Sequence, residues 1–336
     1  WSDSNIKSGV SGSLVFCMYS LQADSELPRL NEFIKAVRLG VYQDKAVVDL
    51  RKAPGDFEII IIGDLHGRVD KFDALLNHRR RITVDGKEIL EDSVLEKIRN
   101  KKAALFILGD AIHATPDVRV EMGDFIKWAK AGVKRQDLEG LVVDLYSNPD
   151  SSIALMRRIM DLKINNPDNF YYILGNHDLI NYHWSKRGPC GFIIDQSIPY
   201  RKALEERFGS KYLDLYRKFV EASPVLLIAD NLVAAHAGPV KGSFNLQKIR
   251  NLSTTNLKNP MLVNLLMGRF CDYSHEGEEV FSYSQDDLSS FLGSLGYDSK
   301  NCWFIVGHTP TQDGFFKRVL FNHYLISGCE REFGYF

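Results

Sequence analysis

The chain has 336 residues, 45% of them hydrophobic and 25% charged, which is typical of a globular protein that buries a full core. Its 42 Lys and Arg residues are balanced by 43 Asp and Glu residues, so the overall charge does not predict nucleic acid or another polyanion as a partner. No stretch reaches the ~18 apolar residues of a membrane span. Five cysteines without close pairing indicate free thiols in a reducing compartment, and we expect a soluble protein.

The first part of the chain is predicted to be an N-terminal extension, residues 1–55, packed on a main domain of residues 56–336. It begins with a Ser/Gly-rich stretch and continues with apolar residues at helical spacing that stop before Gly40. The elements expected in it are a strand at 13–21, a helix at 27–39 and a strand at 46–50.

From Phe57 onward, strands alternate with helices and then pair as hairpins. The expected strands are 57–62, 103–108, 170–174, 224–229, 232–236, 302–306 and a closing pair within 319–327. The expected helices are 69–77, 118–131, 151–165 (with Asp150 or Ser151 as N-cap), 200–208 and 211–222. Two long charged stretches, near 79–102 and 115–150, are predicted to be helical insertions. This order predicts an α/β (α+β) domain with a mixed central sheet or sandwich.

Side chains that bind metals follow five of the apolar strands. Four isoleucines end at Gly63, and Asp64 and His66 come next, at a spacing that lets both side chains reach one cation. A single histidine near a strand end is usually an ordinary surface or hydrogen-bonded residue, but an ordered set of such loops predicts a metal site on a rigid scaffold. The set comprises Asp64, His66, Asp110, Asn176, His177, Asp178, His236 and His308.

These motifs resemble, in order, those of the calcineurin-like metallophosphoesterases, most closely the phosphoprotein phosphatase branch and its bacterial relatives, over about residues 57–327. They are Gly63-Asp64-Leu65-His66-Gly67, Gly109-Asp110, Gly175-Asn176-His177-Asp178, Ala235-His236-Ala237-Gly238 and Gly307-His308-Thr309. The whole chain resembles, more distantly, the Wip effector phosphatases that Legionella secretes. The resemblance implies the calcineurin-like fold, a mixed β-sandwich flanked by helices.

The resemblance also implies two divalent cations. Asp64, His66 and Asp110 would bind the first, and Asp110 would bridge to the second, which Asn176, His236 and His308 would complete. Mixed oxygen and nitrogen ligands suit Mn²⁺, Fe or Zn²⁺ better than Mg²⁺ or Ca²⁺, and we expect Mn²⁺. A water between two such cations ~3.5–4 Å apart is acidified to hydroxide and can attack phosphorus in line.

Two further residues of the third motif take roles in catalysis under this resemblance. His177 would protonate the leaving oxygen as general acid. Asp178 fills a position where relatives carry an acidic residue, and it would orient the local structure. The last motif has a single histidine, His308, where nucleases of the superfamily add a second, and this favours the protein-phosphatase branch.

The second motif departs from the family pattern. Phosphoprotein phosphatases place Asp and Arg after the Gly-Asp pair, and here these positions are His113 and Ala114. We expect His113 to lie beside His177 and to orient or charge it. A bidentate arginine is a strong phosphate clamp, so another arginine is needed. The candidates are Arg269, Arg187 and Arg68.

These observations predict a dinuclear metal-dependent phosphatase that acts on phosphoproteins, with phosphoserine and phosphothreonine preferred and phosphotyrosine possible. A dinucleoside polyphosphate hydrolase with the same motifs is the alternative within the hydrolases. A catalytically silent binding module, whose metals only hold loops together, is the alternative of another class. We expect a cytoplasmic protein or, for a bacterial effector, one delivered into a host cell.

Overall fold

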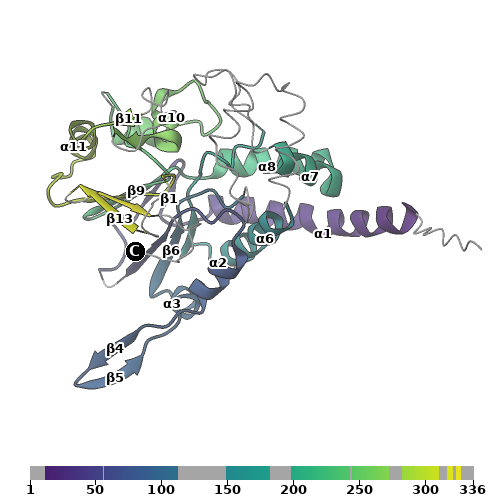
Figure 1. Cartoon of the computed structure of the whole chain (residues 1–336), viewed down its shortest axis with the longest axis horizontal. Helices are drawn as coiled ribbons and strands as arrows, with labels where there is room; N and C mark the ends of the chain where they lie inside the picture. The colour runs from purple at the N-terminus through teal and green to yellow at the C-terminus, as the bar shows by residue number, and fades with distance from the viewer. Residues whose placement is uncertain are drawn as a thin grey trace, which may run out of the picture.

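The computed structural model describes residues 12–55, 57–112, 149–181, 198–242, 244–271, 282–309, 316–320 and 323–326. Its centre is a pair of β-sheets (Figure 1). The larger sheet has the order β1 (Gln43–Asp44), β2 (Val47–Asp49), β8 (Leu226–Ala229), β9 (Leu232–Ala235), β12 (Trp303–Val306), β14 (His323–Ile326) and β13 (Phe316–Leu320). The smaller sheet is parallel, with the order β3 (Glu58–Ile62), β6 (Ala103–Ile107) and β7 (Phe170–Tyr172).

The two sheets pack face to face through alternate side chains of their strands. Along β3, Ile61 joins the core between the sheets, while Ile60 and Ile62 join the core on the other face. This alternation is the period of two that a strand imposes. Phe106 of β6 stacks on Tyr171 of β7 with ring centroids 5.0 Å apart. From the larger sheet the same core receives Val48, Leu227, Ala234, Ile305 and Tyr324.

Helices cover the outer faces of this sandwich. Phe33 of α1 (Gly12–Arg38) packs on Phe219 of α8 (Ser210–Ala222), which contacts Tyr172 of the smaller sheet. On the larger sheet, Phe291 of α11 (Gln285–Ser294) packs on Phe304 of β12. The remaining described helices are α2 (Val69–Leu76), α3 (Val94–Arg99), α6 (Pro149–Asn165), α7 (Ile198–Phe208), α9 (Leu246–Arg250) and α10 (Pro260–Met267). The predicted mixed sandwich flanked by helices is confirmed.

Most predicted elements from Phe57 onward agree with the structure within a few residues. The hairpin around Asp230 and Asn231 is confirmed, because β8 and β9 pair antiparallel from Ala229 opposite Leu232. The closing strand pair is also present, as β13 and β14. The expected helix at 118–131, like residues 115–148 of the second insertion, lies outside the described residues.

Three predictions of secondary structure are wrong. The strand expected at 13–21 is part of α1, because an apolar run of that length suits a helix as well as a strand, and the helix continues through Pro28. The N-cap expected at Asp150 or Ser151 is wrong as well, since α6 begins at Pro149 and both residues lie in its first turn.

The third wrong prediction is the helical character of residues 79–102. The hairpin of β4 (Arg81–Val84) and β5 (Lys87–Leu90) occupies the middle of this stretch, and only α3 after it is helical. Asp85 and Gly86 connect the strands with φ of 49° and 76°, the left-handed pair of a type I′ turn. The hairpin projects away from the body of the molecule (Figure 1).

Segments before residue 56 contribute to the sandwich and to its helical cover. β2 pairs parallel with β8, and Leu30 and Phe33 of α1 are fully buried. The division of the chain at residue 55 stays a prediction. Among the helices that the structure describes, none has the combination of length and apolar character that crossing a bilayer requires.

β10 (Arg269–Phe270) and β11 (Ser282–Tyr283) form a short parallel pair beyond α10. The end of α10 packs against the loop after β9, because the N–H of Ala237 donates to the carbonyl of Leu265 over 2.9 Å. This contact brings Arg269 close to the loop that carries His236.

Candidate metal centre

The loops that follow five strands, three in the smaller sheet and two in the larger, meet at one edge of the sandwich. The N–H of His308, after β12, donates to Oδ2 of Asp64, after β3, over 2.8 Å. The N–H of His177, after β7, donates to Oδ1 of Asp110, after β6, over 2.9 Å. His236, after β9, contacts the carbonyl oxygen of Leu108 through Nδ1 at 2.6 Å. The structure therefore brings together the predicted loops from both sheets.

Three of the predicted ligands have a backbone conformation that non-glycine residues rarely adopt. The φ angles are 42° at His66, 49° at Asp110 and 61° at His308. Such left-handed residues are strained, and they persist where the surrounding structure imposes them, often at functional sites. The three left-handed residues lie in the loops that contribute to the two candidate ligand groups.

Two glycines allow the loops to approach each other closely. A Cβ added at Gly175 would lie 2.2 Å from Oδ1 of Asp110, and one added at Gly307 would lie 2.3 Å from Oδ1 of Asp64. Neither distance is compatible with a non-bonded contact. These two positions therefore require glycine, and this explains why each motif begins with one.

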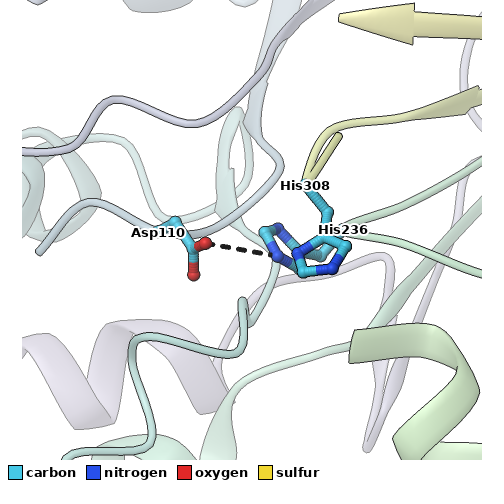
Figure 2. A group of neighbouring side chains, drawn as sticks. All are labelled: Asp110, His236 and His308. Atoms are coloured by element: carbon cyan, nitrogen blue, oxygen red, sulfur yellow. Dashed lines mark ion pairs between the residues drawn. The ribbon is translucent and has the colours of Figure 1, made fainter. Parts of the chain in front are cut away.

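Four ligand atoms converge in one group of the site. Oδ1 of Asn176 lies 2.8 Å from Nε2 of His236 and 3.0 Å from Nδ1 of His308. Oδ2 of Asp110 lies 3.3 Å from Nε2 of His236 (Figure 2). When the Nδ1–H of His236 donates a hydrogen bond to the carbonyl of Leu108, Nε2 keeps a lone pair for a cation, and metal-binding histidines commonly make such a hydrogen bond through their other ring nitrogen.

A second group shares Asp110 with the first. Asp64, His66 and Asp110 offer one ligand atom each, all within 4.8 Å of one another, and Nε2 of His66 lies 3.9 Å from Oδ2 of Asp64. Asp110, His236 and His308 form the other such group. One carboxylate common to two groups is the arrangement of a dinuclear site.

Electrostatics of the site favour cations. Burial raises the pKa of the Asp110 carboxyl well above its usual value, and although His236 opposes this shift, the neighbouring Asp64 and Asp178 carboxylates add to it. Burial opposes protonation of His236, yet the carboxylates of Asp110 and Asp64 raise its pKa to about 9. The buried carboxylates thus lack sufficient positive charge, which bound cations would supply.

His308 has the opposite electrostatic environment. Burial lowers its pKa well below the usual range, and the guanidinium of Arg269 lowers it further. The imidazole of His308 therefore stays neutral and keeps a lone pair, the form in which histidine binds a metal.

Two buried polar atoms support the fit of this site to metal ions. Oδ1 of Asp64 and Nε2 of His308 have no hydrogen-bond partner in the part of the chain that the structure describes. Buried polar atoms without partners are rare and need an explanation, such as a bound ion or water. Together with the carboxylate, amide and imidazole donors around them, they fit two divalent cations of the Mn²⁺, Fe or Zn²⁺ type.

Comparison with known families agrees with this geometry. The family model for calcineurin-like phosphoesterases matches residues 57–312. The chain belongs to this family. The match covers all five ligand-bearing loops, so the predicted family resemblance is confirmed. A search of curated proteins found no match.

Among solved structures, a yeast phosphatase shares the overall fold of this chain. A protein serine/threonine phosphatase from Saccharomyces cerevisiae, with similarity to a human phosphatase, is 14% identical with a TM-score of 0.57. That similarity covers 91% of this chain and 76% of the yeast chain. A cold-active protein-tyrosine phosphatase of a psychrophilic Shewanella is 12% identical with a TM-score of 0.40, over 81% of this chain and 73% of that chain.

The other predicted site residues have different surroundings. His177 is partly exposed, and its Nε2 lies 4.0 Å from Oδ2 of Asp110. Asp178 is fully buried and accepts the N–H groups of Gly175 and Asp110. His113 and Arg187 lie outside the described residues.

The two described candidate arginines also differ. Arg68 makes two hydrogen bonds to the carboxylate of Asp70, at 3.0 and 2.7 Å, and its side chain is exposed. Arg269 is half-buried and near enough to His308 to change its pKa. Of the two, Arg269 is the one whose charge acts on a candidate ligand, His308.

Sequence reasoning does not identify Tyr172. Its hydroxyl contacts Asp178 and the backbone of Ala111, directly behind the ligand loops. An aromatic residue at the end of a buried strand predicts core packing, and no spacing or motif distinguishes Tyr172 from Tyr171 beside it.

Proposed function

We propose that this calcineurin-like phosphoesterase is a dinuclear metal-dependent phosphatase that hydrolyses phosphomonoesters on proteins, with phosphoserine and phosphothreonine preferred over phosphotyrosine. The observation that carries the proposal is the position of Asp110, shared between the group with Asp64 and His66 and the group with His236 and His308. A carboxylate that bridges two cations is the central feature of two-metal hydrolysis.

When bound, two divalent cations, for which we propose Mn²⁺, would acidify water and neutralise charge on the phosphoryl oxygens. The chain supplies the rigid frame for this chemistry. Asp64 and His66 would hold one cation, Asn176, His236 and His308 would hold the other, and Asp110 would be common to both. Backbone amides in these loops donate to neighbouring loops, as those of His177 and His308 do to the carboxylates of Asp110 and Asp64, and such fixed positions favour catalysis.

His177 is proposed as the general acid. Its N–H donates to Asp110, so its backbone is tied to the bridging ligand, while its ring is partly exposed. The ring also lies edge-on to His66 with centroids 5.5 Å apart. A partly exposed imidazole beside the centre can give a proton to the leaving oxygen of the substrate.

Arg269 is proposed as the phosphate anchor in place of the arginine that the second motif lacks. Its positive charge acts on His308, and its Nε is buried. Arg68 is already paired with Asp70 at the surface. A guanidinium close to the ligands can bind two phosphoryl oxygens at once, which a dianionic monoester requires.

The preference for a protein substrate has two supports. The yeast protein with the same fold is a protein serine/threonine phosphatase. The last motif carries only His308 before Thr309, without the second histidine common in nucleases of the superfamily. The compartment, and any delivery into a host cell, stay predictions.

The deciding experiment compares substrate classes with one preparation. The purified chain is stripped of metal, reloaded with Mn²⁺, and assayed for phosphate release from matched phosphoserine, phosphothreonine and phosphotyrosine peptides and for cleavage of diadenosine tetraphosphate. We expect phosphate release from the first two peptides. Cleavage of the dinucleotide without release from any peptide would replace this proposal with the dinucleoside polyphosphate hydrolase.

The alternative that the chain is a catalytically silent binding module is tested with the same assay. Asp64→Ala and His236→Ala each remove one ligand, and they should abolish turnover of an aryl phosphate. Turnover equal to that of the wild-type protein in both variants would exclude the dinuclear mechanism.

A further inference from the structure

The buried hydroxyl of Tyr172 lies directly behind the metal-ligand loops. Tyr172 is the last residue of β7 and is 2% exposed. Its ring packs against Phe219 of α8 with centroids 5.9 Å apart, on the helical side of the smaller sheet. The ring therefore belongs to the core, while the hydroxyl reaches the loops at the strand end.

The hydrogen bonds of this hydroxyl have fixed directions. The hydroxyl accepts the N–H of Ala111 over 2.9 Å, and that amide can only donate. Its own proton is then available for Oδ1 of Asp178, 2.7 Å away. Tyr172 thus links residue 111, in the loop after β6, to residue 178, in the loop after β7.

Asp178 continues this link to the bridging ligand. Its Oδ2 accepts the N–H of Gly175 over 2.8 Å and the N–H of Asp110 over 3.2 Å. Asp110 has the strained φ of 49°, and Oδ1 of its carboxylate accepts the N–H of His177. Tyr172 and Asp178 therefore bind two consecutive backbone amides, at Asp110 and Ala111, in the strained part of the loop.

The carbonyls of the same two residues fix the loop that carries the first ligand pair. The carbonyl oxygen of Asp110 accepts the N–H of His66 over 2.8 Å, and that of Ala111 accepts the N–H of Gly67 over 2.8 Å. A shift at residues 110–111 would consequently move His66 as well as the bridging carboxylate.

We propose that Tyr172 is a positioning residue that, through its hydroxyl, holds the Asp110–Ala111 segment and Asp178 in the arrangement that both cations need. The inference rests on the metal centre of the proposed function, but not on which phosphoester is the substrate. Outer-shell partners of metal ligands commonly change metal affinity by about 10- to 100-fold when removed.

Tyr171 offers a matched control on the same strand. It is fully buried, its side chain lies between the two sheets, and its hydroxyl donates to the carbonyl of Asp168 over 2.9 Å, away from the ligand loops. Tyr171→Phe and Tyr172→Phe each remove one buried, hydrogen-bonded hydroxyl. A purely structural role of Tyr172 predicts the same effects for both.

The test measures metal binding directly. Mn²⁺ is titrated into metal-free wild-type protein, Tyr171→Phe and Tyr172→Phe by calorimetry, and urea unfolding of the metal-free forms reports stability. We expect Tyr172→Phe to weaken Mn²⁺ binding by roughly 10-fold or more, and Tyr171→Phe by less than about twofold. The two variants should shift the urea midpoint by similar amounts. Equal Mn²⁺ affinity in Tyr172→Phe and wild-type protein would overturn the inference.

Two additional measurements distinguish failure of the Tyr172 inference from misfolding of the variant and from failure of the proposed function. Hydrogen exchange on the metal-free wild-type protein should show a protected amide at Ala111 even if Tyr172→Phe does not fold, and fast exchange there would also overturn the inference. Wild-type protein that binds Mn²⁺ but releases no phosphate from any phosphomonoester would refute the proposed function. The calorimetric comparison would still decide the role of Tyr172.

Discussion

The N–H of His308 donates to Oδ2 of Asp64 over 2.8 Å, although the two residues are 244 positions apart in the chain. Asp64 follows a strand of the smaller sheet, and His308 follows a strand of the larger one. The hydrogen bond therefore joins the two sheets at the edge where the ligands gather. The second proposed cation would draw ligands from both sheets, because Asp110 and Asn176 follow strands of the smaller sheet and His236 and His308 follow strands of the larger one.

The Asp64→Ala variant should lose both a proposed metal ligand and the hydrogen bond that joins the two sheets. The second ligand group retains all its members, so we expect the variant to fold and to bind Mn²⁺ with a lower stoichiometry. Loss of metal assistance worth several kcal/mol corresponds to a fall in kcat of at least about 100-fold. The measurements are turnover of an aryl phosphate and elemental analysis of the bound metal.

Asp73→Ala is the matched control for that variant. Asp73 lies on α2 and makes a surface ion pair with Arg158 at 3.0 Å, which contributes at most about 1 kcal/mol to stability. Its turnover and metal content should equal those of the wild-type protein. If Asp64→Ala keeps full turnover in the same assay, Asp64 is not a ligand in the active form.

Gly175→Ala should disturb Asp110, the proposed bridging ligand, without changing any proposed ligand residue. The new Cβ would lie 2.2 Å from Oδ1 of Asp110 and 2.5 Å from its backbone nitrogen, so the loop must move. We expect a loss of about 1–3 kcal/mol in the free energy of unfolding, as for other overpacked sites, and at least about 10-fold weaker Mn²⁺ binding. Urea unfolding and calorimetry measure the two effects.

Gly293→Ala gives the contrasting case. Gly293 lies within α11, and a Cβ there meets nothing within 4 Å. Alanine should raise the free energy of unfolding by about 0.5–1 kcal/mol through helix propensity and leave Mn²⁺ binding unchanged. Wild-type Mn²⁺ affinity in Gly175→Ala would show that the loop relaxes around the methyl group.

The strands that carry the ligands could be predicted because their sequence signal is local. An apolar run such as Ile59–Ile62 ends at a glycine followed by a ligand, and the same pattern recurs along the chain. Close approach of loops explains the glycines at positions 175 and 307, since each faces a carboxylate from a different loop. At these positions the glycine that the sequence motif contains is also the residue that the packing of the loops requires.

Other features could not be predicted for different physical reasons. The apolar stretch 13–21 has no period that separates strand from helix, and tertiary packing decides that it belongs to α1. The turn at Asp85-Gly86 does carry a hairpin signal, which the surrounding charges obscured. The contacts of Tyr172 and the approach of Arg269 to His308 depend on the fold alone.

Arg269→Ala should weaken the binding of inorganic phosphate as a product inhibitor. Charge-assisted hydrogen bonds contribute about 1.5–3 kcal/mol, so the inhibition constant should rise by roughly 10- to 150-fold. Arg68→Ala removes a guanidinium that is exposed and paired with Asp70, and it should change the constant by less than about threefold. A larger effect of Arg68→Ala than of Arg269→Ala would reverse the assignment of the phosphate anchor.

Because of Lys163, we expect the free energy of unfolding to increase as the pH rises above 7. Its side chain is buried in the last turn of α6, and burial lowers its pKa from 10.5 to about 7, although Asp168 opposes the shift. Nζ donates to the carbonyls of Pro167 and Phe170, both at 2.7 Å. A neutral amine has two N–H groups, so it can satisfy both acceptors without its charge.

The sign follows from proton binding in the two states. Between pH 7 and 10.5 the unfolded chain holds the Lys163 proton and the folded chain releases it, so the free energy of unfolding increases with pH in this window. In Lys163→Met this contribution disappears, and the two carbonyls lose their donor. We expect the stability difference between wild-type protein and Lys163→Met, measured by urea unfolding of the metal-free forms, to be larger at pH 9 than at pH 7. A difference that stays constant or shrinks would mean that Lys163 remains charged in the folded protein.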